Sequence, residues 1–194
     1  MIIGVDEVGR GCWAGPLVAA AVKLPSGAQI SGVADSKALS AKKRHELSKL
    51  IKSTTPYIGV GWVWPAEINE LGLSESVRLA MKRAIEQLSF TKRDTIIIDG
   101  NIDYLGLKNS SAAIKADGNV LAVSAASIIA KVARDSYMKQ LALQYPDYGF
   151  EAHVGYGTKR HIEALKTHGV LQQVHRLSYK PIQKYSSARV SSGL

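Results

Sequence analysis

Short apolar runs alternate with stretches of helical periodicity along this 194-residue chain, and that alternation restricts its fold more than any other feature. Residues 2–5, 17–24 and 95–98 form apolar runs of strand length, and the first and third are rich in β-branched side chains. Residues 123–143 and 158–168 instead repeat apolar side chains at helical spacing. Strands and helices mixed in this way predict a layered α/β domain with a mixed sheet.

The charge and cysteine content narrow the kind of protein. The chain has 25 Lys and Arg against 16 Asp and Glu, a net charge of +9, which favours polyanionic partners such as nucleic acids. Cys12 is the only cysteine, so an intrachain disulfide is excluded and a reducing, cytoplasmic location is expected. The sequence lacks the run of about 18 apolar residues that a membrane helix needs. We expect no membrane partner and a monomer.

Acidic residues fall where predicted strands end. Asp6 and Glu7 follow the first strand, Asp99 follows a later one, and Asp117 follows a candidate strand at residues 112–116. If these strands run parallel, the four carboxylates meet at one sheet edge and repel one another. Mg²⁺ or Mn²⁺ would offset that repulsion, and two such ions about 3.5–4 Å apart suit in-line hydrolysis of a phosphodiester. The alternative is that these acids only cap turns.

A glycine-rich turn at residues 9–15 follows the acidic pair and has three interpretations. Its Gly-x-Gly-x-x-x-Gly spacing, with Asp35 about 20 residues on, would suit an NADP-binding oxidoreductase. Against this, the acidic pair would repel a pyrophosphate, and residues 17–22 look like a strand instead of the phosphate-binding helix. The glycines would otherwise let the backbone approach a sugar and its 2′-hydroxyl, with Arg10 beside a phosphate. A plain tight turn is the third interpretation.

The acidic pair and the turn together read Asp6-Glu7-Val8-Gly9-Arg10-Gly11, followed by Ala14-Gly15-Pro16. This run resembles the opening of the type 2 ribonuclease H family, the bacterial ribonucleases HII. Further motifs agree in order, namely Asp35-Ser36-Lys37, Asp99-Gly100, the stretch 124–135, Gly155-Tyr156-Gly157-Thr158 and His175-Arg176. The resemblance covers residues 1–182 as one catalytic domain and leaves a serine-rich tail, 183–194, which we expect to be loosely ordered. It implies an α/β, ribonuclease H-like fold: a five-stranded mixed sheet flanked by helices, with a helical C-terminal segment.

The resemblance also implies an activity. Members cleave the RNA strand of RNA–DNA hybrids and incise 5′ of ribonucleotides embedded in duplex DNA, which leaves a 3′-hydroxyl and a 5′-phosphate. Carried over by motif, Asp6, Glu7, Asp99 and Asp117 would be the catalytic carboxylates that bind two Mg²⁺ or Mn²⁺ ions. The partners implied are the hybrid and the DNA duplex that contains ribonucleotides. The rivals are the NADP-binding enzyme and a nucleic-acid-binding module without catalysis.

Substrate contacts are expected from the same motifs. Gly9, Arg10 and Gly11 would read the 2′-hydroxyl at the RNA–DNA junction, and Tyr156 would stack on the following deoxyribose. The alternative for Tyr156 is a partly buried structural tyrosine. We further expect Ser36 and Lys37 to bind a phosphate of the DNA strand.

Several positions depart from the family pattern or lie outside it. The fourth acid usually stands between Lys-Gly and Ser, whereas Asp117 stands between Lys115-Ala116 and Gly118-Asn119. Ribonucleases HIII usually carry Thr in place of Arg10, so Arg10 favours type HII. Trp13 replaces a smaller aliphatic residue, with an effect expected on packing alone. A stripe of Ser124, Ser127, Lys131 and Arg134 would bring its serines to a phosphate, and the five histidines are expected to be structural or solvent-exposed.

Overall fold

The computed structural model describes residues 1–33 and 39–186, which divide into two compact units. Unit 1 comprises Met1–Val8, Val18–Trp62 and Val77–Ala133. Unit 2 comprises Gly9–Leu17, Val63–Ser76 and the segment from Arg134 onward. In the described part of the chain, no helix combines the length and the apolar character needed to cross a membrane.

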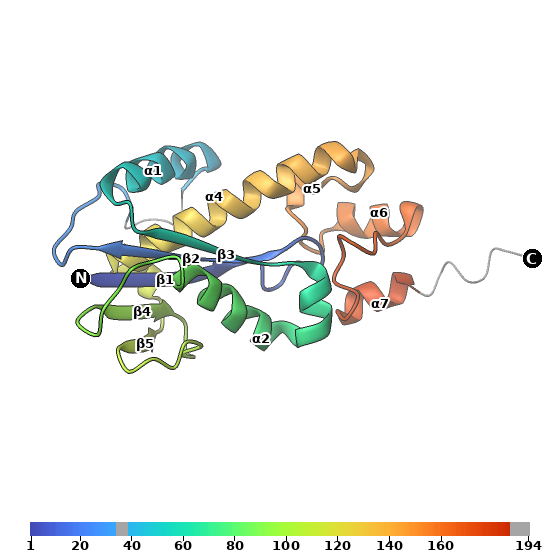
Figure 1. The fold of residues 1–194 in the computed structure, drawn as a ribbon. Helices are drawn as coiled ribbons and strands as arrows, with labels where there is room; N and C mark the ends of the chain where they lie inside the picture. The colour runs from blue at the N-terminus through green and yellow to red at the C-terminus, as the bar shows by residue number, and fades with distance from the viewer. Residues whose placement is uncertain (34–38, 187–194) are drawn as a thin grey trace, which may run out of the picture. The chain divides into compact units, whose positions relative to one another are not determined.

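A five-stranded mixed sheet in the order β3-β2-β1-β4-β5 forms the centre of unit 1 (Figure 1). β1 (Ile2–Val8) pairs antiparallel with β2 (Leu17–Leu24) and parallel with β4 (Thr95–Asp99). β4 pairs parallel with β5 (Ser110–Ala113), and β3 (Ile58–Val63) lies beside β2. The expected sheet is confirmed, and the strands that precede the acidic residues do run parallel.

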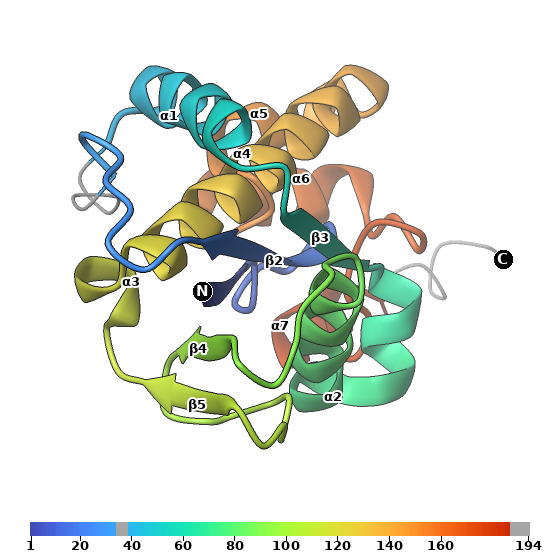
Figure 2. The ribbon, with the colours of Figure 1, turned by 60° about the vertical axis from the view of Figure 1, so that its left-hand side comes forward.

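Helices flank both faces of this sheet (Figures 1 and 2). α1 (Ala41–Thr54) and the first part of α4 (Leu121–Gln144) share one apolar core with β2. The Ser40 hydroxyl begins α1 by accepting a hydrogen bond from the Lys43 N–H, as its sequence position predicts. The part of α2 (Pro65–Ile85) from residue 77 onward covers the opposite face.

Gly4 explains how α4 comes close to β1. A Cβ atom on Gly4 would overlap the backbone of Ala122 and Val123, so only glycine permits this approach. Alternate residues of a strand share one face, and Asp6 therefore faces α4 together with Gly4. The close packing of α4 is thus what buries Asp6.

Unit 2 is helical. It contains the first part of α2 and the second part of α4. Its described residues further form a 3₁₀ turn, η2 (Pro146–Tyr148), and the short helices α5 (Phe150–His153), α6 (Lys159–His168) and α7 (Lys180–Ser186). Its core joins Ala14 of the glycine-rich turn to Met138, Phe150 and Val174. The boundary expected after residue 182 falls inside α7, which continues to Ser186.

Candidate functional site

The acidic pair lies inside β1, which runs to Val8 and not only to residue 5 as expected. Successive strand residues point to opposite faces, so Asp6 is buried against α4 while Glu7 is partly exposed on the other face. The Glu7 backbone N–H donates a 2.8 Å hydrogen bond to Asp6 Oδ1. The two carboxylates therefore stand at one strand end in different environments.

Asp99 and Asp117 lie next to each other, but Asp117 lies in a short helix and not at the end of a strand as expected. Asp99 is the last residue of β4. The strand expected at residues 112–116 ends at Ala113, and Lys115 adopts a left-handed conformation with φ 58°. This change of direction begins the short helix α3 (Ala116–Asn119), which carries the buried Asp117. The Asp117 backbone N–H donates to Asp99 Oδ1 at 3.3 Å.

The electrostatics around Asp6 are unfavourable for a carboxylate. Burial, followed by the negative charges of Glu7 and Asp99, raises the pKa of Asp6 to about 8. A hydrogen bond from Ser127 on α4 and the one from the Glu7 N–H lower this pKa without offsetting the other effects. At neutral pH the Asp6 carboxyl therefore holds a proton unless positive charge arrives nearby.

Asp94 shows how a structural carboxylate in the same unit differs. Asp94 Oδ2 accepts hydrogen bonds from the Thr91 backbone N–H at 2.7 Å and from Lys23 Nζ at 3.0 Å. These two donors hold the pKa of Asp94 well below its usual range. Its charge is fully compensated within the fold, whereas that of Asp6 is not.

The donor chemistry around Asp6, Glu7, Asp99 and Asp117 fits a hard divalent cation. All four side chains offer carboxylate oxygens, which Mg²⁺ and Mn²⁺ prefer. Among the residues that the structure describes, no group of three or more His, Cys, Asp or Glu side chains is arranged to hold a metal ion. Mg²⁺ keeps several of its waters and commonly uses only one or two protein carboxylates, so a complete protein cage is not required.

The serines of α4 support the acidic residues. The Ser124 hydroxyl donates to the Asp117 carbonyl oxygen at 2.6 Å, and Ser127 hydrogen-bonds to Asp6. Their helical spacing had suggested contact with a phosphate. In the structure, both hydroxyls position the candidate metal-binding residues.

In unit 2, two buried arginines hold the backbone of the glycine-rich turn. Arg134 donates from Nε to the Pro16 carbonyl at 2.8 Å and from Nη2 to the Ala14 carbonyl at 3.1 Å. Its Nη1 donates to the Val154 carbonyl at 2.9 Å. Gly9, at φ 92°, is required here because a Cβ would overlap the Arg134 guanidinium.

Arg176 holds two further carbonyls of this turn. It donates from Nε to the Gly15 carbonyl at 3.1 Å and from Nη1 to the Arg10 carbonyl at 3.0 Å. The Tyr179 hydroxyl donates to the same Arg10 carbonyl at 2.8 Å. The carbonyls of the turn are thus bound from inside, while Arg10 and Gly11 remain exposed.

The strand that follows the turn argues against a dinucleotide site. A pyrophosphate in such a site binds at the N-terminus of the helix that follows the glycines. Here the glycines lead into β2, whose eight residues are all buried. The backbone N–H groups and the helix dipole that would bind the phosphate are therefore missing from this described segment.

Tyr156 lies beside the same turn. A Cβ on Gly11 would sit 4.0 Å from Tyr156 Cε1, an ordinary van der Waals contact. The Tyr156 side chain hydrogen-bonds to Cys12, and burial followed by the effect of Cys12 raises the pKa of its hydroxyl. The residue is nevertheless 41% exposed. Unit 2 therefore brings together Gly9, Arg10, Gly11 and Tyr156, and leaves part of the Tyr156 ring accessible.

Two predicted substrate contacts involve residues that the structure does not describe. Ser36 and Lys37 fall outside the described residues, so their expected role with a phosphate stays a prediction. Conversely, no sequence pattern indicated that Arg134 binds the turn, because its partners Ala14 and Pro16 are more than 100 residues away.

Comparison with known proteins gives a consistent family match. The family model described as ribonuclease HII matches residues 3–182. Ribonuclease HII of Geobacillus sp. (strain WCH70) is 48% identical over 183 residues, which are 94% of this chain and 65% of that relative. Ribonuclease HII of Shewanella halifaxensis (strain HAW-EB4) is 49% identical over 181 residues, 93% of this chain and 88% of the relative. The chain thus spans just under two thirds of the first relative and most of the second.

Solved structures show the same fold. Ribonuclease H2 from Pyrococcus horikoshii OT3 superposes with a TM-score of 0.81 at 28% identity, over 96% of this chain and 97% of that one. Bst-RNase HIII in complex with Mn²⁺ superposes with a TM-score of 0.73 over 97% of this chain and 70% of that one. At 21% identity, the second likeness supports the fold alone.

Proposed function

This chain belongs to the ribonuclease HII family, and from that premise we propose that it is a metal-dependent endonuclease of RNA–DNA hybrids. The proposed substrates are the RNA strand of a hybrid and single ribonucleotides embedded in duplex DNA. Cleavage falls 5′ of the ribonucleotide and leaves a 3′-hydroxyl and a 5′-phosphate. The cytoplasm as location and a monomer as the acting species belong to the same proposal.

The observation that carries this proposal is the uncompensated charge around Asp6. A structural carboxylate such as Asp94 is bound to a buried lysine, whereas the pKa of Asp6 is raised to about 8 by burial and by Glu7 and Asp99. Folding does not favour such an arrangement by itself. Perturbed acids that cluster at the ends of parallel strands are typical of a functional site.

Asp6, Glu7, Asp99 and Asp117 would hold two Mg²⁺ or Mn²⁺ ions. When bound, such ions neutralise the charge on the phosphodiester and promote attack by water. The chain's own residues keep the carboxylates in place. Ser127 and the Glu7 N–H orient Asp6, the Asp117 N–H orients Asp99, and Ser124 fixes the backbone at Asp117.

Gly9, Arg10, Gly11 and Tyr156 would read the sugar at the junction. A 2′-hydroxyl both donates and accepts hydrogen bonds, and exposed backbone near Gly11 offers partners for it. The ring of Tyr156, held beside Gly11, would stack on the next deoxyribose, where a 2′-hydroxyl would not fit. Ser36 and Lys37 remain proposed contacts to a phosphate of the DNA strand.

A denaturing gel tests the proposal directly. A DNA duplex with one ribonucleotide is incubated with the protein, with and without Mg²⁺ or Mn²⁺, and a parallel series uses a continuous hybrid. We expect one metal-dependent cut 5′ of the ribonucleotide. Asp6→Asn should reduce cleavage at least about 10³-fold, because a neutral amide is a poor metal ligand, while binding to the hybrid persists.

The other outcomes separate the rivals. Cleavage of the continuous hybrid alone would keep the nuclease and remove junction recognition. Binding without any metal-dependent cut would indicate a nucleic-acid-binding module. Near-normal cleavage by Asp6→Asn would refute the metal-binding role of Asp6.

A further inference from the structure

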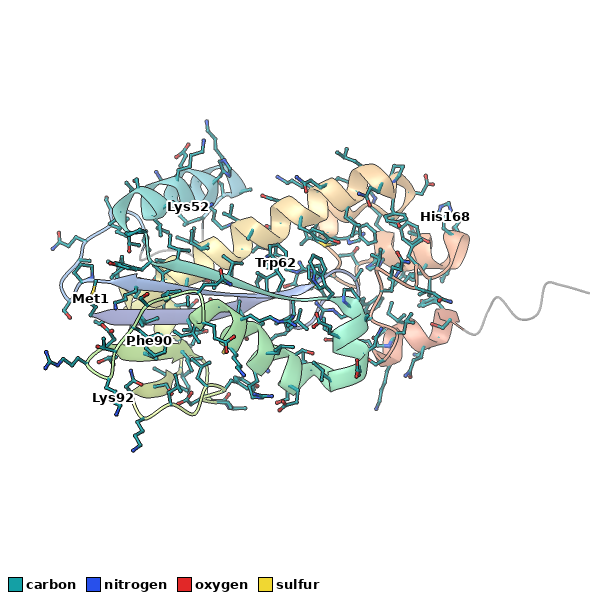
Figure 3. All side chains as sticks on the ribbon, viewed as in Figure 1. Met1, Lys52, Trp62, Phe90, Lys92 and His168 are labelled. Atoms are coloured by element: carbon teal, nitrogen blue, oxygen red, sulfur yellow. The ribbon has the colours of Figure 1, made fainter. Side chains whose placement is uncertain are left out.

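Three of the five histidines are buried together in unit 2. His153, His161 and His175 are each less than 8% exposed, whereas His168, on the outside of α6 in Figure 3, is exposed. The rings of His153 and His161 are stacked with centroids 4.5 Å apart. His161 and His175 meet edge to edge, with their Nε2 atoms 3.1 Å apart. The proposed chemistry uses none of the three.

The neighbours of these rings fix where each proton must be. His161 Nδ1 lies 2.9 Å from the Tyr156 carbonyl oxygen, which can only accept, so Nδ1 carries the proton. In a neutral ring the Nε2 of His161 is then bare and must accept from His175 Nε2–H. The Nδ1 of His175 is bare in turn, and the Leu171 N–H donates to it at 3.0 Å. The Leu171 carbonyl oxygen also lies 3.2 Å from this Nδ1, but it accepts its hydrogen bond from the His175 backbone N–H at 2.8 Å. One direction of hydrogen bonding therefore satisfies the whole series.

The surrounding groups support neutral rings. Burial lowers the pKa of both His161 and His175 to about 4, so neither ring carries a second proton at neutral pH. Neighbouring His153 fits the same pattern. Its Nε2 lies 2.8 Å from the Tyr148 carbonyl oxygen, and its Nδ1 accepts from the Gly155 N–H at 3.2 Å.

The series of hydrogen bonds from His175 to His161 ends at the backbone carbonyl of Tyr156. Trp13 contacts the residues on both sides of Tyr156. The Trp13 backbone N–H donates to the Gly155 carbonyl at 2.8 Å. A Cβ on Gly157 would overlap the Trp13 indole, so Trp13 lies directly against that glycine. The Tyr156 carbonyl accepts from the Thr158 N–H at 2.9 Å as well as from His161. Trp13 therefore does more than fill space, because it contacts the residues before and after Tyr156.

We propose that His175 and His161 are positioning residues: their fixed tautomers deliver a hydrogen bond to the Tyr156 carbonyl and so hold the Tyr156 ring where it reads the deoxyribose after the ribonucleotide. This inference rests on the proposed function of Tyr156. His175 acts through His161, since its Nε2–H donates the hydrogen bond that the bare Nε2 of His161 accepts. Without that donor, His161 would be free to adopt the other tautomer, and its bare Nδ1 would then face the Tyr156 carbonyl oxygen.

Nuclear magnetic resonance of the unaltered protein tests the tautomers without any substitution. Imidazole ¹⁵N chemical shifts, with protein labelled at histidine, distinguish a protonated nitrogen from a bare one. We expect the Nδ1–H form for His161 and the Nε2–H forms for His175 and His153. An Nε2–H form for His161, or a doubly protonated ring at neutral pH, would overturn the proposal.

Two substitutions at His161 then test the effect on specificity. His161→Phe keeps an aromatic ring against His153 and removes both hydrogen bonds, whereas His161→Asn keeps a donor for the Tyr156 carbonyl. His161→Phe should lower kcat/KM on a duplex with one ribonucleotide about tenfold relative to the continuous hybrid. His161→Asn should restore most of that ratio, and His168→Phe, on the exposed end of α6, should not change it. An equal loss on both substrates, or no rescue by Asn, would overturn the proposal.

A double-substitution cycle shows whether His161 acts through Tyr156. In a Tyr156→Ala background, His161→Phe should change the substrate ratio by less than about twofold, because the group that it positions is already absent. A full further loss would mean that His161 acts elsewhere, and the proposal would fail. Failure of the unaltered protein to cut the single ribonucleotide would instead overturn the proposed function. If His161→Phe does not fold, the tautomers and the Asn variant still decide the question.

Discussion

Buried charge has opposite roles in two regions of the molecule. One is the acidic end of the sheet in unit 1, which carries Asp6, Glu7, Asp99 and Asp117 and is called the carboxylate edge below; the other is the glycine-rich turn of unit 2. Asp6 is buried beside two further acids, and its pKa is raised to about 8 in consequence. Arg134 and Arg176 are also completely buried, yet their guanidinium groups donate to five backbone carbonyls between them. One region retains an electrostatic conflict, and the other uses charge to fix a backbone.

The difference matches what each region is proposed to bind. A site for divalent cations needs negative charge that the protein itself does not neutralise. A site for a neutral sugar needs backbone groups and rings held in fixed positions, and buried hydrogen bonds hold them there. Four predictions, from the largest expected effect to the smallest, distinguish the uncompensated charge of the carboxylate edge from the hydrogen-bonded charge of the turn.

The largest effect is expected from breaking the backbone support in unit 2. Arg134→Met would leave the carbonyls of Ala14, Pro16 and Val154 buried without this donor, at a cost of about 3–5 kcal/mol in the free energy of unfolding. Urea unfolding measures this loss. Arg160→Met is the matched control, because the exposed ion pair of Arg160 with Glu151 contributes about 1 kcal/mol or less. Equal losses in the two variants would contradict the assigned role of Arg134.

At the carboxylate edge, a substitution is expected to stabilise the protein and not to destabilise it. At pH 8 without divalent cations, Asp6→Asn should stabilise the protein by roughly 1–3 kcal/mol, because it removes a carboxylate that burial and its neighbours disfavour. For a chain of this size, each kcal/mol raises the melting temperature by about 2–4 °C. Added Mg²⁺ should stabilise the unaltered protein more than the variant. Glu86→Gln, on the exposed surface of unit 1, is the control and should change little.

Local sequence patterns predicted the fold, and they placed the acidic residues at or just after the ends of strands. The run at residues 17–24 became β2 with the expected bounds, and Asp99 ends β4. The role of Asp117 stays a prediction, and its expected place at the end of a strand was wrong, since a left-handed Lys115 ends the strand pattern early and begins α3. A single residue in an unusual conformation leaves no periodic signal.

Local sequence patterns could not predict the hydrogen bonds that support the turn and Tyr156, because these bonds join residues far apart in the chain. Helical spacing grouped Arg134 with the serines of α4, yet the Arg134 side chain binds carbonyls that lie about 120 residues earlier in the chain. The edge-to-edge contact of His161 with His175 likewise joins residues 14 positions apart, and only His175 belongs to a motif of the family pattern. Periodicity reveals which face of a helix is buried, but not which distant backbone it meets.

A smaller effect is expected from Tyr156, where the turn of unit 2 meets its proposed ligand. Tyr156→Ala should lower kcat/KM on a duplex with one ribonucleotide about tenfold relative to a continuous hybrid, since stacking on the deoxyribose is lost. The ring is 41% exposed, so the melting temperature should change little. Parallel losses of stability and activity on both substrates would favour the alternative that Tyr156 is only structural.

The smallest effect separates the two regions by the sign of their pH dependence. The folded-state pKa of His161 and of His175 is about 4, below the ordinary value of 6.5, so the unfolded chain takes up protons first and stability falls as the pH drops from 6.5 toward 4. The folded-state pKa of Asp6 is about 8, above the ordinary 3.8, so stability falls as the pH rises from about 4 to 8. The two regions therefore oppose each other between pH 4 and 6.5.

Asp6→Asn removes one of these opposing contributions. Without divalent cations, the variant should lose about 1 kcal/mol more than the unaltered protein between pH 6.5 and 5, because the histidines then act unopposed. Between pH 6.5 and 8 the unaltered protein should lose stability while the variant stays level. Urea unfolding at pH 5, 6.5 and 8 measures both differences. Parallel curves for the two proteins would mean that Asp6 carries an ordinary charge, and the contrast between the regions would then no longer rest on electrostatics.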